Sequence, residues 1–176
     1  CRHRNDWPKW KDAIQSELDS LAKRKVFGPV VQTLEGVKSV GYKWVFVRKR
    51  NEKDEIVRYK ARLVTQNFSQ KPGFDYDETY SPVVDTITFR YLVSIAVHEK
   101  LDMRLMDVVT AYLYGNLEND IYMRILEGFN MPNACKSNLR DVYSIKLQRS
   151  LYGIKQSGCM WYNRLNECLT KEGYIN

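Results

Sequence analysis

The sequence predicts an α+β fold, and three observations support this prediction. Apolar residues recur at three- and four-residue steps in three segments, which indicates amphipathic helices. Two further segments alternate in side-chain character around a short polar turn, as in a β-hairpin. The helical and strand-like segments do not alternate as βα units, so a parallel α/β sheet is not expected. With 176 residues, 44% of them hydrophobic, the chain is long enough for one substantial domain or two small lobes that share a core.

The first predicted helix runs from Asp6 to about Lys25. Its apolar stripe consists of Trp10, Ile14, Leu18 and Leu21. Asp6 is the expected cap, and Pro8 falls in the first turn, where proline is tolerated. The basic run 23–25 suits the negative end of the helix dipole, and Gly28 with Pro29 marks the stop. A solvated helix end accounts for those charges.

Residues 37–49 and 56–65 are the predicted strands of the hairpin, joined by the polar turn 51–55. Basic residues are interleaved with aromatic residues along it: Lys43, Arg48, Lys49, Arg50, Arg58, Lys60 and Arg62. The chain carries 28 Lys and Arg against 21 Asp and Glu, a net charge of +7. This excess of positive charge favours an acidic partner such as nucleic acid, although a hairpin whose basic side chains are simply solvated would have the same sequence pattern.

The segment 66–85 is rich in turn formers, and we expect an ordered loop packed by Phe68, Phe74, Tyr76 and Tyr80. Its acids, Asp75, Asp77 and Glu78, lack the glycine and distal glutamate of a calcium-binding loop, so capping and loop hydrogen bonds explain them better. A second helix is predicted over 86–99, capped by Asp85.

Three short strands and a third helix complete the predicted elements. The strand 101–107 would place Met103, Leu105 and Asp107 on one face, and further strands are expected at 121–124 and 142–147. The third helix spans about 158–172 and stops at Gly173. Its expected apolar face consists of Trp161, Leu165, Cys168 and Leu169.

Cysteine spacing and hydropathy restrict the class of protein. Cys1, Cys135, Cys159 and Cys168 show no paired zinc-site spacing, and only His3 and His98 could assist them, so we expect reduced intracellular thiols. The polar N-terminus and the lack of an apolar run of about 18 residues point to neither membrane nor secretion.

Asp107 is the candidate metal ligand, because it ends an apolar run and is followed by a small-residue turn and the aromatic Tyr112. An isolated aspartate at such a place is more commonly a helix cap or turn residue. The metal interpretation therefore depends on the rest of the chain.

Several stretches, in order, resemble the reverse transcriptase domain of copia-type long-terminal-repeat retrotransposon Pol polyproteins. They are the pattern of Trp10, Ala13, Glu17 and Leu21; YKWVFVRKRN with RYKARLV; FSQKPGFDYDETYSPVV; MDVVTAYLYG; IYMR with EGF; and SLYGIKQS with Trp161 and Tyr162. The resemblance implies a right-hand polymerase fold. Residues 1–100 would form a fingers-like region with the N-terminal helix and basic hairpin, and 101–176 would form a partial palm.

The same resemblance implies RNA-directed DNA synthesis on an RNA or DNA template–primer with dNTPs and two Mg²⁺ ions. Asp107 matches the first catalytic, metal-binding acid, and the backbone of Val108 would hold a metal or triphosphate oxygen. Tyr112, where the family more often has Phe, would stack under the incoming sugar. Lys60 and Arg62 would grip the triphosphate. The nucleotide and template side would be lined by Tyr152, Gly153 and Lys155.

The chain departs from the family pattern at Asn67, where Gly is usual, and at Gly158 and Cys159, where Pro-Arg is usual. The second metal-binding acids, a Tyr-x-Asp-Asp hairpin, are expected downstream of Tyr174, and no Asp-Asp pair occurs in the sequence. We therefore expect a piece of a longer polyprotein that does not polymerise by itself and whose unpaired palm edge invites aggregation.

The implied partners are the remaining palm, a ribonuclease H and an integrase. The implied location is a cytoplasmic virus-like particle or the nucleus. A non-catalytic nucleic-acid-binding remnant and a decayed element are the alternatives.

Overall fold

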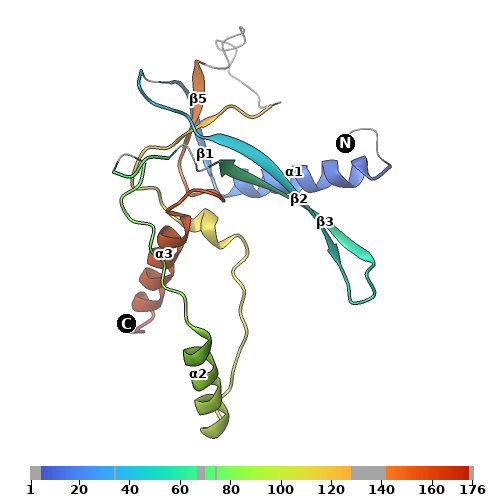
Figure 1. The fold of residues 1–176 in the computed structure, drawn as a ribbon, viewed down its shortest axis with the longest axis vertical. Coiled ribbons are helices and arrows are strands. Elements are labelled where there is room, and N and C mark those ends of the chain that lie inside the picture. The colour runs from blue at the N-terminus through green and yellow to red at the C-terminus, as the bar shows by residue number, and fades with distance from the viewer. Residues whose placement is uncertain (1–4, 34, 67–69, 74, 128–141, 175–176) are drawn as a thin grey trace.

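The computed structural model describes residues 5–33, 35–66, 70–73, 75–127 and 142–174. The fold is α+β, as the sequence predicts. Its elements, in chain order, are α1 (Trp7–Lys23), β1 (Phe27–Gln32), β2 (Gly41–Arg50), β3 (Ile56–Gln66), α2 (Thr86–His98), the 3₁₀ turn η2 (Ala111–Tyr114), β4 (Tyr122–Arg124), β5 (Tyr143–Leu147) and α3 (Ser157–Lys171). Figure 1 shows a central body from which the β2–β3 hairpin and α2 project in different directions.

Helix α1 confirms the first predicted helix, with two differences at its ends. Asp6 occupies the N-cap position, but its side chain accepts a hydrogen bond from Arg48 Nη2 at 2.6 Å and makes no capping bond. At the other end Lys25 adopts a left-handed conformation, with φ at 53°. The predicted stop at Gly28 and Pro29 is wrong, because the chain turns at Lys25 and both residues then lie in β1.

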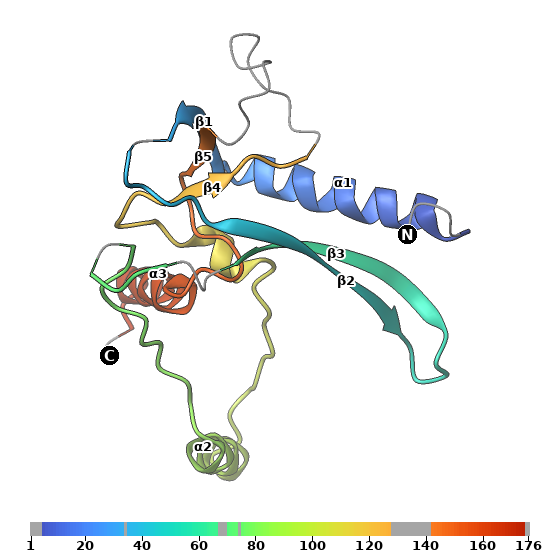
Figure 2. The ribbon, with the colours of Figure 1, turned by 45° about the horizontal axis from the view of Figure 1, so that its top comes forward.

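The predicted hairpin is confirmed. Strands β2 and β3 pair antiparallel from Gly41 opposite Gln66 to Lys49 opposite Arg58. The turn is closed by Asn51, whose side-chain oxygen accepts hydrogen bonds from the backbone N–H groups of residues 53 and 55. Helix α1 packs against β3. The tip of the hairpin extends beyond the body in both ribbon views (Figures 1 and 2).

A three-stranded antiparallel sheet has the order β1-β5-β4, with Phe27 opposite Leu147 and Met123 opposite Ile145. The strands at 121–124 and 142–147 are thereby confirmed. Strand β1 was not predicted, because Gly28 and Pro29 are strand breakers. It forms because it is an edge strand whose register shifts between Phe27 and Val30, which accommodates proline.

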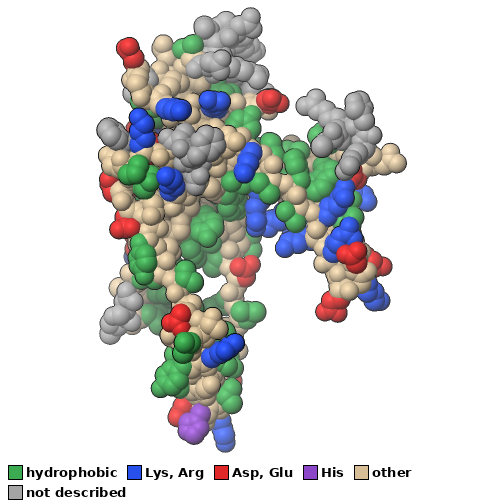
Figure 3. Space-filling view, in the orientation of Figure 1, with side chains coloured by type: hydrophobic (Ala, Val, Ile, Leu, Met, Phe, Trp, Pro, Cys, Tyr) green, Lys and Arg blue, Asp and Glu red, His purple; other side chains and the backbone are tan. Residues whose placement is uncertain are grey.

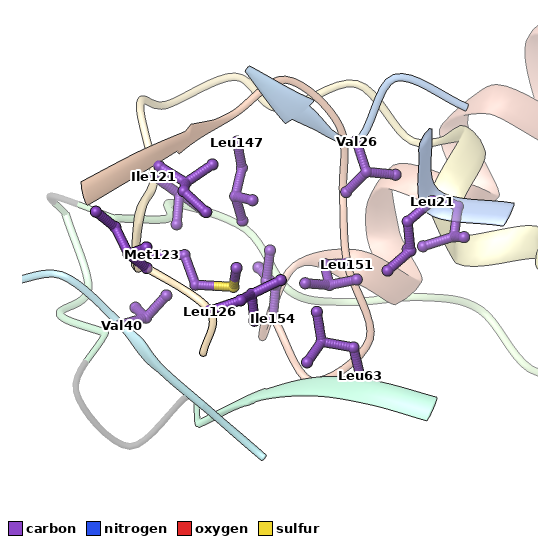
Figure 4. Packing of buried hydrophobic residues seen from close by; sticks show 13 residues of the cluster. Leu21, Val26, Val40, Leu63, Ile121, Met123, Leu126, Leu147, Leu151 and Ile154 are labelled. Atoms are coloured by element: carbon purple, nitrogen blue, oxygen red, sulfur yellow. The ribbon is translucent and has the colours of Figure 1, made fainter. Parts of the chain in front are cut away.

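The core lies between this sheet, the inner end of the hairpin, α1 and the turn after β5. Figure 4 shows Leu63 of β3 beside Leu151 and Ile154, and Ile121 beside Leu147. The fully or almost fully buried apolar side chains are Leu21, Val26, Val40, Ala61, Leu63, Leu113, Ile121, Met123, Leu126, Ile145, Leu147, Leu151 and Ile154. They come from both sides of residue 100, so the two regions proposed for the chain share one core.

The predicted strand 101–107 is wrong. Residues 101–108 have no regular secondary structure, and Leu105 is fully exposed. An alternating apolar pattern indicates only which side chains would share a face of a strand. The backbone N–H and C=O groups of a strand also need a neighbouring strand as hydrogen-bond partner, and none of the described residues provides one here.

Helix α2 and its cap are confirmed: Asp85 Oδ1 accepts hydrogen bonds from the N–H groups of Ile87 and Thr88 at 2.8 and 2.9 Å. The helix nevertheless has no buried residue, and Phe89 and Leu92 are more than half exposed. Both ribbon views place α2 apart from the body, and hydrophobic side chains lie on its surface (Figures 1, 2 and 3).

Helix α3 is confirmed, and Gly173 ends it with φ at +89°. Its buried side chains are in the first turn, at Ser157, Cys159 and Met160, whereas Cys168 is exposed. The predicted apolar face is therefore wrong at Cys168 and at Leu169, which is 41% exposed, because α3 buries side chains only in its first turn.

The loop before α2 is only partly as predicted. Asp75 accepts a hydrogen bond from the Lys71 N–H and Glu78 accepts from Thr79 and Tyr80, so these acids make the expected loop hydrogen bonds. Tyr80 does not pack into the loop, since it is 71% exposed. Asn67, Phe68, Phe74, Cys1, His3 and Cys135 lie outside the described residues. Among the described helices, none has the length and apolar character needed to cross a membrane.

Candidate nucleotide and nucleic-acid site

Three elements that are distant in the sequence bring Arg62, Tyr152 and Tyr112 together. The Arg62 guanidinium of β3 lies over the Tyr152 ring, with Cζ 5.5 Å from the ring centroid. Tyr152, in the turn between β5 and α3, meets Tyr112 of η2 edge to face, with the centroids 6.3 Å apart and the planes at 83°. This cation–aromatic–aromatic row offers a positive group and two aromatic rings whose planes are nearly perpendicular.

The turn that carries Tyr152 is fixed to β3 by its backbone. The Tyr152 carbonyl accepts hydrogen bonds from Thr65 N–H at 2.7 Å and from Thr65 Oγ1 at 3.1 Å. Gly153 follows with φ at +90°, and a Cβ there would collide with the Thr65 carbonyl oxygen and lie 2.7 Å from Val64 Cγ1. Only glycine permits this close approach of turn and strand. Burial, and to a smaller extent the charge of Glu17, raises the pKa of the Tyr152 phenol.

Lys155 lies in the same turn but faces the loop before α2. Its Nζ is 3.1 Å from the Tyr76 hydroxyl and 5.0 Å from the centre of that ring. Its backbone N–H donates to Gln70 Oε1 at 3.0 Å. Gln156 donates to the Asp75 carbonyl and accepts from Gln70 Nε2, so two buried glutamines join loop and turn. The sequence did not identify this pair, although both glutamines occur in the motifs FSQKPG and LYGIKQ.

Lys60, two residues before Arg62 on β3, lies in an excess of positive charge. Burial lowers the pKa of Lys60, and the charges of Arg62, Arg58 and Lys49 lower it further. The charge of Glu17 acts in the opposite direction but does not cancel these effects. Figure 3 shows Lys and Arg side chains gathered on the projecting hairpin.

Glu17 is the buried acid next to this cluster, and sequence reasoning gave it no role in the site. Its Oε1 accepts a hydrogen bond from the Leu63 N–H of β3 at 3.3 Å. Burial raises the pKa of Glu17, against the lowering effects of that hydrogen bond and of the charges on Arg62, Lys60 and Arg24. The signal that could have identified it is a glutamate on the otherwise apolar side of α1.

Asp107 and Val108 are not joined to this group. Both are exposed, and Asp107 makes no hydrogen bond or ion pair within the described part of the chain. The described residues contain no group of three His, Cys, Asp or Glu side chains that could hold a metal ion. A single carboxylate fits one ligand position of a Mg²⁺ ion shared with substrate phosphates, and does not fit a two-ion site. Thr110, which precedes η2, has a left-handed backbone with φ at 60°.

Comparison with known proteins gives a consistent family. The chain is 39% identical over 163 residues to the Retrovirus-related Pol polyprotein from transposon TNT 1-94 of Nicotiana tabacum, covering 93% of this chain and 12% of that protein. It is 35% identical over 171 residues to the corresponding polyprotein from transposon RE1 of Arabidopsis thaliana, covering 96% and 11%. An uncharacterized mitochondrial protein of Arabidopsis thaliana is 41% identical over 93 residues, covering 51% and 52%.

The chain thus spans about a tenth of the length of the polyproteins that it resembles. No solved structure matches it. A family model described as "Reverse transcriptase (RNA-dependent DNA polymerase)" matches residues 25–176. The resemblance to copia-type retrotransposon Pol polyproteins is confirmed, and the chain belongs to the reverse transcriptase (RNA-dependent DNA polymerase) family.

Proposed function

We propose that this chain provides the fingers and the first palm segment of an RNA-directed DNA polymerase, and that the row of Arg62, Tyr152 and Tyr112 binds the incoming dNTP. The observation that carries the proposal is the meeting of these three side chains from β3, η2 and the β5–α3 turn. A nucleotide presents a polyanion, a sugar and an aromatic base, and the row offers a cation and two aromatic rings.

The cations of β3 would bind the triphosphate. Lys60 and Arg62 are two residues apart, so their side chains leave the same face of the strand. The Arg62 guanidinium can donate two parallel hydrogen bonds to phosphate oxygens, whereas Lys60 acts as a point charge. The positive charge around Lys60, which Glu17 balances only in part, favours an anion at this place. Lys155, held at the loop before α2, would contact the template side.

Tyr112 would stack under the sugar and exclude a ribose 2′-hydroxyl by its bulk. Its contact with Tyr152 supports this role, because the edge of one ring limits the positions available to the other. Because Gly153 has no side chain, it would allow the nucleotide to approach the backbone of the turn closely, just as it allows β3 to do so.

Asp107 would hold a Mg²⁺ ion together with the dNTP phosphates, and the backbone of Val108 would lie beside it. When bound, such an ion stabilises negative charge on the phosphoryl oxygens and activates the attacking hydroxyl. The template–primer, the remaining palm with a second set of acids, a ribonuclease H and an integrase are proposed as partners.

The test is binding of a fluorescent dNTP analogue by Arg62→Gln, with Arg58→Gln as the matched control. Both variants remove one cation from the same face of β3, but only Arg62 contacts Tyr152. Loss of a charge-assisted contact worth about 1.5–3 kcal/mol predicts a weakening of roughly 10- to 100-fold for Arg62→Gln. Equal affinities of the two variants would overturn the proposed nucleotide site.

A second candidate function is non-catalytic nucleic-acid binding by the hairpin, which the cation excess around Lys60 also favours. It predicts a salt-dependent affinity for a template–primer duplex that falls when Lys60 and Arg62 are neutralised, with no measurable binding of the dNTP analogue. Unchanged duplex affinity after that neutralisation would exclude it.

A further inference from the structure

A separate basic pocket lies where the C-terminal end of α1 meets η2. Its volume is about 440 Å³, within the range of about 300–1,000 Å³ that is usual for small-ligand sites. It is lined by Lys23, Arg24, Lys25, Leu113, Tyr114 and Arg149. Four of these six residues are cations, and none is an acid. The dipole of α1 accounts for cations at positions 23–25, but it does not account for Arg149, which comes from the segment after β5.

The positive charge of this pocket is largely uncompensated. Lys23, Lys25 and Arg149 have no carboxylate within ion-pair distance in the described part of the chain. Arg24 lies over the Tyr114 ring at 5.4 Å and donates from Nη1 to the Ser20 side chain at 2.9 Å. Its Nε, however, is buried and has no hydrogen-bond acceptor among the described residues. Buried donors in native proteins are nearly always paired, so the Arg24 guanidinium carries a spare donor that a rotation of the side chain would offer to an anion in the pocket.

The backbone at Lys25 fixes the position of this lysine at the end of α1. Val26 N–H donates to the Leu21 carbonyl at 3.1 Å and Lys25 N–H donates to the Ala22 carbonyl at 2.9 Å, which is the Schellman arrangement of a helix end. The left-handed residue of this arrangement is usually glycine, because a side chain there is strained. Here it is a lysine that lines the pocket. Lys100 has the same left-handed conformation at the end of α2, with φ at 52°, so this conformation places Lys25 at the pocket but does not by itself indicate a ligand.

We propose that this pocket binds the phosphodiester backbone of a single nucleic-acid strand next to the nucleotide site. Four cations that line one pocket suit a chain of phosphates better than one monoanion, and the partly exposed ring of Tyr114, with Arg24 over one face, leaves its other face for a base to stack on. Tyr114 and Tyr112 are two residues apart in the same short turn η2, so the strand would lie beside the row of Arg62, Tyr152 and Tyr112. This assignment rests on the proposed function, and it specifies in addition which surface of the protein the nucleic-acid strand follows.

The experiment measures fluorescence anisotropy of a labelled 20-nucleotide oligouridylate over a salt series. The test variant is Lys25→Gln with Arg149→Gln, and the control is Lys11→Gln with Lys171→Gln, two exposed lysines that do not line the pocket. Both lose two positive charges. Each lost phosphate contact lowers the slope of log K against log salt by about 0.7, so the test variant should lose about 1.4 and the control almost nothing. Equal losses in the two variants, or no binding by the unaltered chain, would overturn the proposal.

Two further measurements separate this proposal from its competitors. Lys25→Gly removes the cation and the backbone strain together, so the affinity for the strand should fall several-fold while Tm stays the same or rises. A fall in both affinity and Tm would mean that Lys25 has only a structural role and would overturn the proposal.

Tripolyphosphate supplies charge without bases, so it should compete only weakly with the oligouridylate. Equally strong competition at the same phosphate concentration would assign the pocket to free polyphosphate and overturn the strand proposal.

The dNTP analogue distinguishes failure of this proposal from failure of the proposed function. Its affinity should be unchanged in the Lys25 and Arg149 variant and reduced in Arg62→Gln. If Arg62→Gln does not change the affinity for the dNTP analogue while strand binding still depends on the pocket, the proposed nucleotide site is refuted and the strand-binding pocket is not.

Discussion

Replacing Gly153 by alanine tests whether the close contact between the β5–α3 turn and β3 organises the candidate site. A left-handed alanine costs about 1–2 kcal/mol. In addition, its Cβ would collide with the Thr65 carbonyl, so the turn must move away from β3. That movement weakens the two hydrogen bonds that the Tyr152 carbonyl accepts from Thr65, each with a net value of about 0.5–1.5 kcal/mol. The expected destabilisation is about 3 kcal/mol, or roughly 6–12 °C in Tm.

Gly173→Ala is the matched control. Gly173 has almost the same backbone, with φ at +89°, but nothing lies within 4 Å of a Cβ placed there. The Gly173→Ala variant should therefore lose only the stability that the left-handed backbone of alanine costs, about 1 kcal/mol, or roughly 2–4 °C in Tm. The assay is thermal and urea unfolding followed by circular dichroism, together with binding of the dNTP analogue, which Gly153→Ala should weaken by displacing Tyr152. Equal destabilisation of the two variants would refute the argument that the contact with Thr65 matters.

Three other predictions follow from the structure. Hydrogen bonds from Thr88 and Ile87 lower the pKa of Asp85, so the cap supports α2 above about pH 4 and is lost as the pH falls through the depressed pKa. Asp85→Ala should abolish that pH dependence of the helical signal at 222 nm and should speed amide exchange in α2 without changing Tm; a large fall in Tm would show that α2 is part of the core. Burial raises the pKa of Glu17, so its ionised form opposes folding, and Glu17→Gln, which keeps an acceptor for the Leu63 N–H, should hold or raise Tm at pH 7. The wild type should approach the Gln variant as the pH falls through the raised pKa, and a lower Tm for Glu17→Gln at pH 7 would contradict this account. Leu105→Ser with Met106→Ser should reduce concentration-dependent light scattering at unchanged Tm, because both side chains are almost entirely exposed; unchanged scattering would exclude this segment as the site of self-association.

Local patterns predicted the elements whose stability is mainly local. The β2–β3 hairpin follows from alternation around a polar turn, and α2 follows from its periodicity and the cap at Asp85. Both form with contacts between residues that are near in sequence. The motifs LYGIKQ and RYKAR were also sufficient to select Tyr152 and Arg62, although nothing in the sequence placed one over the other.

The elements that depend on distant partners could not be predicted in the same way. Strand β1 carries Gly28 and Pro29 and forms because β5 pairs with it. The apolar run that ends at Asp107 has the pattern of a strand but no neighbouring strand among the described residues. Glu17 and the glutamine pair were missed because their burial comes from packing between elements, which periodicity does not report.

The order of the three-stranded sheet has a consequence for the kinetics of folding. Phe27 pairs with Leu147, 120 positions later, whereas β2 and β3 are joined by a turn of five residues. Closing the longer loop costs about 3 kcal/mol more chain entropy. The hairpin can therefore form early, but β1 has no partner until the ribosome has released β5. At about 5–20 residues per second, β1 stays unpaired for several seconds or more of synthesis. During that interval its exposed edge is open to chaperones and to other nascent chains.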